Sequence, residues 1–373
     1  MEKRKKQIAL GLTSGRLVLA VWLVGISMVG VLCGLGQQAN FLIHDSTLPK
    51  NTVITTVAVQ GLPTSIVVSP DSTTAYVVNA GSSSVSVIDA KNKYTVKATI
   101  SVPENPGYLA ISPNGKTLYV SSTLVAGTVS VIDATQATYP VVATVTVGPY
   151  PEGLAVTPDG KELYVTSVGY QDNGINIEGS VSVVNTATNT VTGTIAANGS
   201  PFLLLFTENG KQADVLNYAG TGFLQFINTK SGQISKVTAG GGDIFYPSGM
   251  SSDPSATKLY ITDLQNYVTV CNASDGTVTG KFLVVPSEFS TFYLGKPALS
   301  KNGKYLYVPY ESNAITGAYG NEVVTVDTST GKIVGTPITV GNSPFWVQTS
   351  PDGRTLYVSN TYSDTVTVVD ISQ

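Results

Sequence analysis

The chain has 373 residues, 12% of them charged, and is rich in Gly (37), Pro (19) and Tyr (19). This composition is typical of an all-β repeat protein rather than of a helical or disordered one. The net charge is −3, yet five of the 21 basic residues lie within the first 16 positions, so the remaining body is more acidic. An acidic body without a basic cluster argues against nucleic-acid binding.

The first 36 residues form an apolar leader with a basic start. Basic residues at positions 3–6 and Arg16 precede a charge-free run from Leu17 to Gly36. As a helix this run would span about 30 Å, enough to cross a bilayer. Residues 1–36 are therefore interpreted as a membrane anchor through residues 17–36 or, alternatively, as a signal peptide. Because basic flanks stay inside, both interpretations place the body outside the cytoplasm, at the cell surface or in the periplasm.

A polar tether, residues 37–50, is predicted to connect the leader to a repeat region over residues 51–373. The repeat unit is 43 to 50 residues long and occurs seven times. Each unit opens with a fixed position, occupied by Pro63, Pro106, Pro151, Pro201, Pro247, Leu294 in place of Pro, and Pro344. Thirteen residues later stand Tyr76, Tyr119, Tyr164, Asp214 in place of Tyr, Tyr260, Tyr307 and Tyr357.

The last unit illustrates the secondary structure predicted for each repeat. Three runs rich in β-branched and aromatic residues, Phe345–Thr349, Thr355–Ser359 and Thr365–Asp370, predict three strands. The segment 350–353, Ser-Pro-Asp-Gly, predicts a tight hairpin between the first two. A fourth run follows each of the first six units, over residues 95–102, 140–147, 190–196, 232–239, 277–285 and 332–340.

The seventh unit lacks a fourth run, and one extra run, Thr52–Val59, precedes the first unit. All seven units have four strands if this N-terminal strand becomes the outer strand of the last sheet. The sequence therefore predicts a seven-bladed β-propeller with four antiparallel strands per blade, closed into a ring by the N-terminal strand.

Two recurring positions are given structural roles. The Tyr series is predicted to pack between adjacent sheets, with each hydroxyl near a polar partner. The third strand of each unit ends in an Asp or Asn that is predicted to bond its own turn. These residues are Asp89, Asp133, Asn185, Asn228, Asn272, Asp327 and Asp370.

The hairpin and Tyr motifs resemble those of the YVTN family of β-propeller repeats, which run roughly SPDG, LYVTN and VSVIDT. In the last repeat the matching segments are 350–353, 357–360 and 366–370. The fourth repeat departs most, with Glu208-Asn209-Gly210 in the hairpin and Asp214 in place of Tyr. The resemblance implies a propeller in a family that includes exported proteins similar to the periplasmic YncE type and archaeal surface-layer proteins.

Candidate ligand-binding residues gather at the expected mouth of the central channel. The loops between the second and third strands are longest in the third and sixth repeats, at Ser167–Gly179 and Tyr310–Asn321. Their oxygen-bearing side chains suggest a site for a sugar, a peptide or Ca²⁺, and include Asp172, Glu178, Glu311, Asn313 and Glu322. Aromatic residues open the inner strands and suggest stacking on a ligand, namely Tyr108, Tyr150, Phe202, Tyr246, Tyr293, Phe345 and Trp346. The alternatives are tolerated surface insertions and packing between blades.

Catalysis finds little support in the sequence. Histidine-dependent schemes have only His44, which lies in the tether. A carboxylate pair such as Glu152 with Asp172 remains an open alternative. Cys33 and Cys271 fit neither a disulfide framework nor a metal spacing, and no cofactor motif is present.

The function expected from the sequence is an exported propeller that binds a protein, peptide or carbohydrate without cofactor, metal or catalysis. One alternative is a surface-layer or cell-envelope structural protein. The other is a lactonase- or lyase-like propeller enzyme, which would require a cluster of carboxylates with shifted pKa values in the channel.

Overall fold

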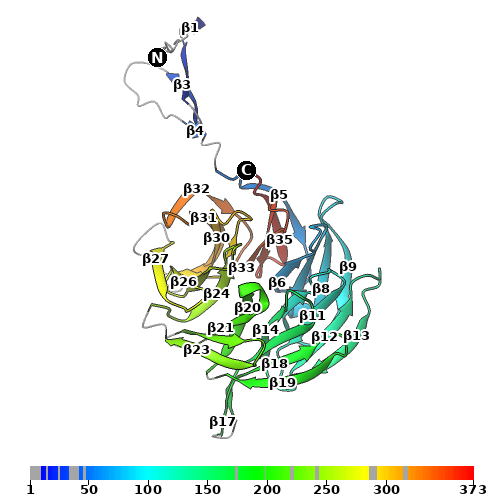
Figure 1. Ribbon diagram of the computed structural model, residues 1–373. Helices are drawn as coiled ribbons and strands as arrows, with labels where there is room; N and C mark the ends of the chain where they lie inside the picture. Colours follow the sequence, from blue (N-terminus) through cyan, green and yellow to red (C-terminus); the bar gives the residue numbers. More distant parts are fainter. Residues whose placement is uncertain are drawn as a thin grey trace. The chain divides into compact units, whose positions relative to one another are not determined.

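The computed structural model describes residues 10–13, 16–23, 26–32, 42–44, 48–172, 175–197, 199–218, 222–239, 243–284, 292–313 and 318–373. Residues 51–370 form one compact unit, a ring of seven antiparallel sheets around a central channel (Figure 1). This arrangement confirms the predicted seven-bladed propeller. The regular elements other than strands in the described residues are two short 3₁₀ turns, η1 (Ala80–Ser82) and η2 (Glu208–Gly210).

Each blade runs from an inner strand at the channel to an outer strand at the rim. The inner strands are β6 (Pro63–Val68), β10 (Pro106–Ile111), β14 (Pro151–Val156), β20 (Pro201–Thr207), β24 (Pro247–Ser252), the divided pair β28 (Phe292–Leu294) and β29 (Ala298–Leu299), and β33 (Pro344–Thr349). The second strands are β7 (Thr74–Asn79), β11 (Thr117–Ser122), β15 (Glu162–Ser167), β21 (Gln212–Asn217), β25 (Lys258–Asp263), β30 (Tyr305–Asn313) and β34 (Thr355–Asn360).

The third and outer strands complete the blades. The third strands are β8 (Ser84–Asp89), β12 (Thr128–Asp133), β18 (Ser180–Asn185), β22 (Phe223–Asn228), β26 (Tyr267–Asn272), β31 (Tyr319–Asp327) and β35 (Thr365–Asp370). The outer strands are β9 (Thr95–Ser101), β13 (Val141–Thr146), β19 (Thr190–Ala196), β23 (Gln233–Ala239), β27 (Val278–Leu283), β32 (Lys332–Thr339) and, in blade 7, β5 (Thr52–Ala58).

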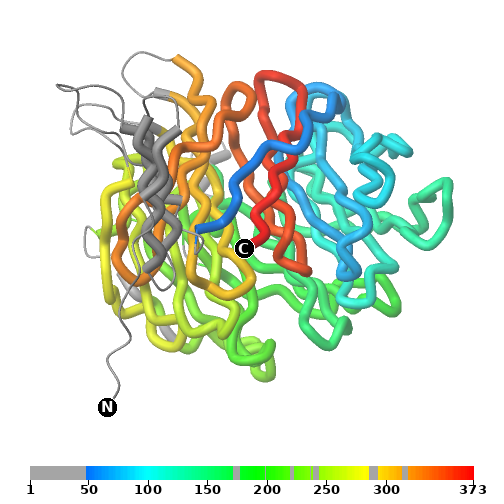
Figure 2. Tube along the Cα trace, turned by 90° about the horizontal axis from the view of Figure 1, so that it is seen from above, coloured from blue at the N-terminus to red at the C-terminus, as the bar shows by residue number. Residues whose placement is uncertain are grey.

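The N-terminal strand closes the ring, as the sequence predicts. Strand β5 pairs antiparallel with β35, with Thr365 opposite Ala58 and Asp370 opposite Thr52. In Figure 2 the blue strand of residues 52–58 runs beside the red C-terminal strand. The last blade is therefore built from both ends of the propeller region, which ties the first and last blades together.

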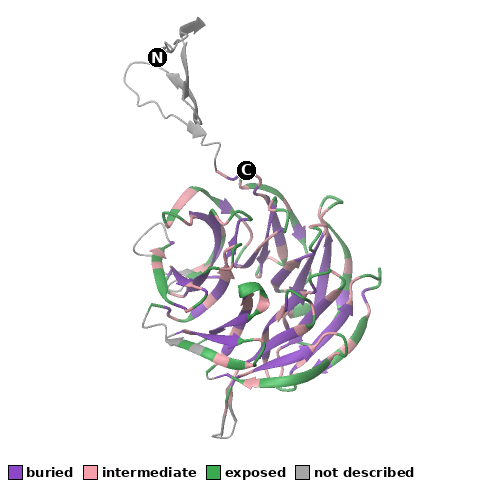
Figure 3. Cartoon of the chain, viewed as in Figure 1, coloured by how far each residue is buried: buried purple, intermediate pink, exposed green. Residues whose placement is uncertain are grey.

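The core lies between neighbouring blades, where the inner and middle strands are buried and the outer strands are exposed (Figure 3). Tyr76 of blade 1 meets Tyr139 of blade 2 edge to face, and Tyr164 of blade 3 meets Phe206 of blade 4 in the same way. The predicted packing role of the Tyr series is confirmed. The predicted hydroxyl partner is wrong for Tyr307 and Tyr357, whose buried hydroxyls have no hydrogen-bond partner among the described residues.

Hydrogen bonds from the second strands also join adjacent blades. Ser121 Oγ donates to the carbonyl of Glu152 at 3.1 Å, and Thr166 Oγ1 donates to the carbonyl of Phe202 at 3.1 Å. Thr262 Oγ1 does the same to Gly295 at 3.0 Å. In these three blades the small hydroxyl two residues after the Tyr thus fixes the start of the next inner strand.

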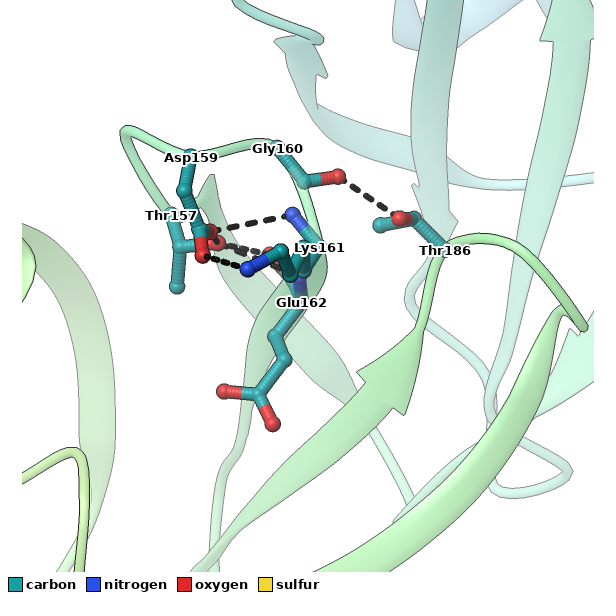
Figure 4. Close-up of polar contacts among 6 residues, drawn as sticks. All are labelled: Thr157, Asp159, Gly160, Lys161, Glu162 and Thr186. Atoms are coloured by element: carbon teal, nitrogen blue, oxygen red, sulfur yellow. Dashed lines mark hydrogen bonds and ion pairs between the residues drawn. The ribbon is translucent and has the colours of Figure 1, made fainter.

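The hairpin turns form the opposite face of the ring from the channel mouth. In blade 3 (Figure 4) Thr157 Oγ1 donates to Asp159 Oδ1 at 2.7 Å, and Asp159 accepts from the Lys161 N–H. Gly160 adopts a φ of 76°, which favours glycine. Thr186 Oγ1 from the next turn donates to the Gly160 carbonyl. The polar groups of this turn therefore bond to one another or to the neighbouring turn of the same blade.

The Asp and Asn residues that end the third strands bond their own turns, as predicted, at five positions. Asp89, for example, accepts from the backbone of Lys91 at 3.0 Å and of Asn92 at 3.1 Å. The side chains of Asp133, Asn185, Asn228 and Asp327 accept in the same way.

The leader is described by itself, and it differs from the expected helix. Strands β1 (Leu10–Thr13), β2 (Arg16–Leu23), β3 (Ile26–Leu32) and β4 (Leu42–His44) pair in sequence order as one sheet. Within the part of the chain that the structure describes, no helix reaches the length and apolarity needed to cross a bilayer. The run holds many β-branched residues and glycines, which have low helix propensity. Gly36, most of the tether and Cys33 lie outside the described residues.

Candidate functional site

The central channel contains a cavity of about 340 Å³ to which all seven blades contribute. Its walls come from the inner strands and are largely apolar. The lining consists of residues 108–111, 153–156, 203–205 and 250–252, with Val67, Lys296 and Trp346. Because the inner strands start at the mouth and end at the hairpin turns, this set places the cavity below the mouth.

Trp346 and Tyr108 meet across the upper end of this cavity. Their ring centroids lie 5.8 Å apart with an interplanar angle of 62°, an edge-to-face contact. Trp346 is only 8% exposed, and its Nε1 is buried without a hydrogen-bond acceptor among the described residues. A buried N–H donor with no acceptor costs free energy.

Within the part of the chain that the structure describes, Lys296 is the one charged residue that lines the cavity. Its Nζ lies 4.6 Å from the centroid of the Trp346 ring and 3.5 Å from Gln348 Oε1. No ion pair with Lys296 occurs among the described residues. The side chain is only partly exposed, and desolvation by the surrounding channel wall lowers the pKa of Lys296 to about 8.

A break in the inner strand of blade 6 positions this lysine. Between β28 and β29 the backbone leaves its own blade, and Lys296 forms a parallel bridge with Trp346 of blade 7. The Lys296 N–H donates to the Phe345 carbonyl at 2.9 Å. A Cβ on Gly295 would lie 2.1 Å from that carbonyl oxygen, so only glycine permits the approach.

Two carboxylates stand on the mouth side of the aromatic contact. Glu152 is the second residue of β14, and Glu311 lies near the end of β30. Burial raises the pKa of each to about 7, and a hydrogen bond with Tyr108 opposes the rise at Glu152. Burial, followed by the charges of both carboxylates, raises the pKa of Tyr108. One tyrosine hydroxyl therefore lies close to two acids from blades 3 and 6.

Exposed tyrosines lie in the loops that surround the mouth and at the adjoining strand ends. Tyr319 and Tyr362, from blades 6 and 7, stack with centroids 4.5 Å apart and are 53% and 55% exposed. Tyr218 of blade 4 contacts Tyr246 of blade 5 with centroids 5.8 Å apart. Tyr293 is exposed as well. Large exposed aromatic rings on one face are typical of a contact surface.

The residues predicted as ligand-binding divide into three groups in the structure. Tyr108 and Trp346 line the cavity, with Glu311 close to Tyr108. Tyr246 and Tyr293 are exposed at the mouth. The others at the inner strands are partly buried in aromatic or core contacts: Phe202 and Phe345 against the core, and Tyr150 against Tyr170.

The two long loops take different forms. The insertion of blade 3 makes a separate hairpin, β16 (Tyr170–Asp172) and β17 (Ile175–Ile177), whereas that of blade 6 lengthens β30 and β31 to nine residues each. Figure 1 shows the hairpin projecting from the ring on the far side from β30 and β31. Glu178 is exposed and Glu322 partly buried, while the side chains of Asp172 and Asn313 lie outside the described set.

Sequence reasoning missed Lys296, Tyr218 and Tyr362. A signal for Lys296 was available, because the third position of each unit can be aligned. That position holds Ser65, Tyr108, Gly153, Leu203, Gly249, Lys296 and Trp346, and the lysine is its only charged member. Among the described residues, no group of three or more His, Cys, Asp or Glu side chains could hold a metal ion.

A second cavity, of about 430 Å³, lies between the hairpin turns of blades 3 and 4. It is lined by polar turn residues such as Asp159 and Lys161, which pair with each other at 3.2 Å and are mostly exposed. The polar groups of this cavity already form hydrogen bonds and an ion pair within the turns, so fewer of them remain to bind a ligand than in the channel.

Comparison with known proteins agrees with this architecture. Residues 64–202 match the Choice-of-anchor I domain. The match begins in β6 and ends in β20, so it spans the first three blades. A search of curated proteins found no match.

Among solved structures, hydrazine synthase of Kuenenia stuttgartiensis is similar, with a TM-score of 0.70 and 22% identity. The likeness covers 83% of this chain and 96% of that chain. At this identity it shows the fold alone. The fold is widespread, since 1739 chains of solved structures match.

Proposed function

We propose that this chain is an exported, surface-associated β-propeller of YVTN type that binds a protein, peptide or carbohydrate at its mouth face. The observation that carries the proposal is the set of exposed tyrosines on the mouth loops, with the stacked pair Tyr319 and Tyr362 at its edge. Aromatic rings of this kind supply large contact area on sugars and peptides at low entropic cost.

Surface association is supported by the match to a choice-of-anchor domain and by the basic, apolar leader. The basic residues of the leader would remain on the cytoplasmic side and direct the propeller outward. The propeller would then either stay attached to the membrane through residues 17–36 or be released when the leader is cleaved as a signal peptide.

The test is binding of the full-length chain to carbohydrate and peptide arrays. The double variant Tyr319→Ala/Tyr362→Ala should lose at least roughly tenfold in affinity for any ligand that the wild type binds, as expected when aromatic contacts are truncated. Val142→Ala is the matched control, because Val142 is 56% exposed on the outer strand β13, away from the mouth. Equal binding by the double variant would refute the proposal, and concentration-dependent self-association would favour a surface-layer protein instead.

A second candidate function is an enzyme, and one observation favours it. Glu152 and Glu311 share Tyr108 and have pKa values raised to about 7, as acid–base groups that work near neutral pH require. Hydrolysis of lactones or glycosides that depends on both Glu152 and Glu311 would establish this function. Turnover that persists in Glu152→Gln and Glu311→Gln would exclude a role for this pair.

A further inference from the structure

Two side chains of the cavity wall, Lys296 and Trp346, carry hydrogen-bond donors that no carboxylate among the described residues accepts from. Lys296 carries an ammonium that donates to the neutral Gln348 Oε1 at the long distance of 3.5 Å. The Trp346 Nε1–H has no partner within the described chain. Among the described residues, no acidic side chain lines the cavity. A partly desolvated charge without a counter-ion opposes folding, so this site favours a ligand that brings an anionic acceptor.

The rest of the wall constrains the ligand further. Val67, Ala110, Leu205 and Met250 offer apolar surface, and Ser251 is among the few polar residues on this side. One ammonium with one additional N–H nearby matches a monoanion, whereas a phosphate dianion usually requires more donors. A volume of about 340 Å³ is at the small end of ligand sites in proteins.

We propose that the channel cavity binds a small organic monocarboxylate. Its carboxylate lies at the Lys296 ammonium beside the Trp346 indole, and its apolar part lies against Val67, Ala110, Leu205 and Met250. This site is below the Tyr108–Trp346 contact, separate from the exposed tyrosines at the mouth, and it does not depend on the proposed function of that face.

Three observations support the placement. The break at Gly295 and the bridge to Trp346 hold the Lys296 backbone at the channel instead of within its own blade. The cation lies over the indole ring, which keeps it on this wall without neutralising it. The carboxylates of Glu152 and Glu311 stand on the mouth side, outside the cavity lining, and do not occupy the position at Lys296.

Calorimetric titration of the full-length chain tests the site with acetate, hexanoate and benzoate, each at pH 6.5. Benzyl alcohol serves as the uncharged analogue of benzoate. The expected result is binding of hexanoate or benzoate, with benzyl alcohol at least tenfold weaker. Absence of binding by all three acids, or equal binding of benzoate and benzyl alcohol, would overturn the proposal.

Variants then assign the binding to this cavity. Lys296→Met should abolish carboxylate binding, Lys296→Arg should retain it, and Lys161→Met should leave it unchanged because Lys161 is an exposed turn residue. Circular dichroism verifies that each variant is folded. Unchanged affinity in a folded Lys296→Met protein refutes the site.

Fluorescence gives a second readout, because the chain has two tryptophans, Trp22 and Trp346. In a Trp22→Phe background, benzoate or hexanoate should change the emission of Trp346 at the same concentrations that produce heat. The tyrosine variants at the mouth should bind the acids as the wild type does, which separates failure of this site from failure of the mouth face. A loss of acid binding in those variants would place the acids at the mouth and contradict the cavity.

Discussion

Polar side chains at the two ends of the inner strands differ in how completely they are hydrogen-bonded. At the hairpin face, Thr157 and Asp159 form a closed set of short bonds within one turn, and the same pairing recurs as Ser69 with Asp71 and Ser112 with Asn114. Toward the mouth, the Trp346 Nε1 is buried without an acceptor among the described residues, and the partly exposed Lys296 ammonium forms no ion pair with any of them. The first arrangement stabilises the fold, and the second is stable only because the rest of the ring supports it.

The pKa shifts show the same contrast. A hydrogen bond from Thr157 is the largest cause that lowers the pKa of Asp159, and one from Ser69 lowers that of Asp71. At the mouth, burial raises the pKa values of Glu152 and Glu311. The ionised form is thus favoured at Asp71 and Asp159 in the turns and disfavoured at Glu152 and Glu311 near the channel, which makes the channel the better candidate for ligand chemistry.

The hairpin face and the mouth both depend on closure of the ring. Opening the ring is therefore expected to cause the largest loss of stability. Deleting residues 1–60 removes β5 and its pairing with β35, whereas deleting residues 1–46 keeps both. The longer deletion should lose several kcal/mol of unfolding free energy, at about 1 kcal/mol per hydrogen bond, together with the burial of Val57. Urea denaturation of the two proteins measures the difference, and equal midpoints would show that β5 does not close the ring.

The sequence was sufficient for the fold because the repeat is short and regular. The offset of thirteen residues between the opening position and the Tyr position predicts every hairpin, and the extra run Thr52–Val59 predicts the closure. Even blade 4, with Asp214 in place of Tyr, keeps the pairing of its neighbours. Residues that recur in each repeat therefore predict the strands and hairpins that recur in each blade.

The channel was harder to predict because its residues depart from the repeat. Glu152 and Glu311 come from blades 3 and 6 and meet at Tyr108 of blade 2 only through the curvature of the whole ring. The leader shows a second limit, since an apolar run of β-branched residues fits a strand as well as a helix. In both cases the deciding contacts are not local in the sequence.

Asp214 is a buried acid at the hairpin end and tests whether that end is fully satisfied. It accepts from Thr207 Oγ1 at 2.9 Å and from Gln212 Nε2 at 2.6 Å, yet burial still raises its pKa to about 7. Because the folded pKa lies above the unfolded value, the folded state loses stability as pH rises from about 4 to 7. Over this window the cost is at most roughly 4 kcal/mol.

The variant Asp214→Asn removes this titration while keeping the size of the side chain. Its unfolding free energy, measured in urea at pH 5 and pH 8, should fall less between the two values than that of the wild type. Glu152 and Glu311 titrate in both proteins, so the difference isolates Asp214. An identical pH dependence would mean that the bonds from Thr207 and Gln212 already hold the pKa of Asp214 near its ordinary value.

Lys296→Met tests the other end of the strands, where a side chain is expected to cost stability. The folded pKa of Lys296 is lowered to about 8, so its charged form opposes folding below that pH, and the opposition fades as pH rises toward the unfolded value. Replacing the partly exposed ammonium with an apolar side chain of similar length should raise the unfolding free energy at pH 7 by about 1 to 3 kcal/mol.

The gain from Lys296→Met should shrink at pH 10, where the wild-type lysine is largely neutral in the folded state. Thermal unfolding at the two pH values measures it, with Lys161→Met as a surface control that changes little at either. A destabilised Lys296→Met would show that the lysine is a structural support of the channel, like the turn residues at the opposite end. A stabilised variant would show that the ring retains this charge at a cost in stability, as expected of a residue kept for binding.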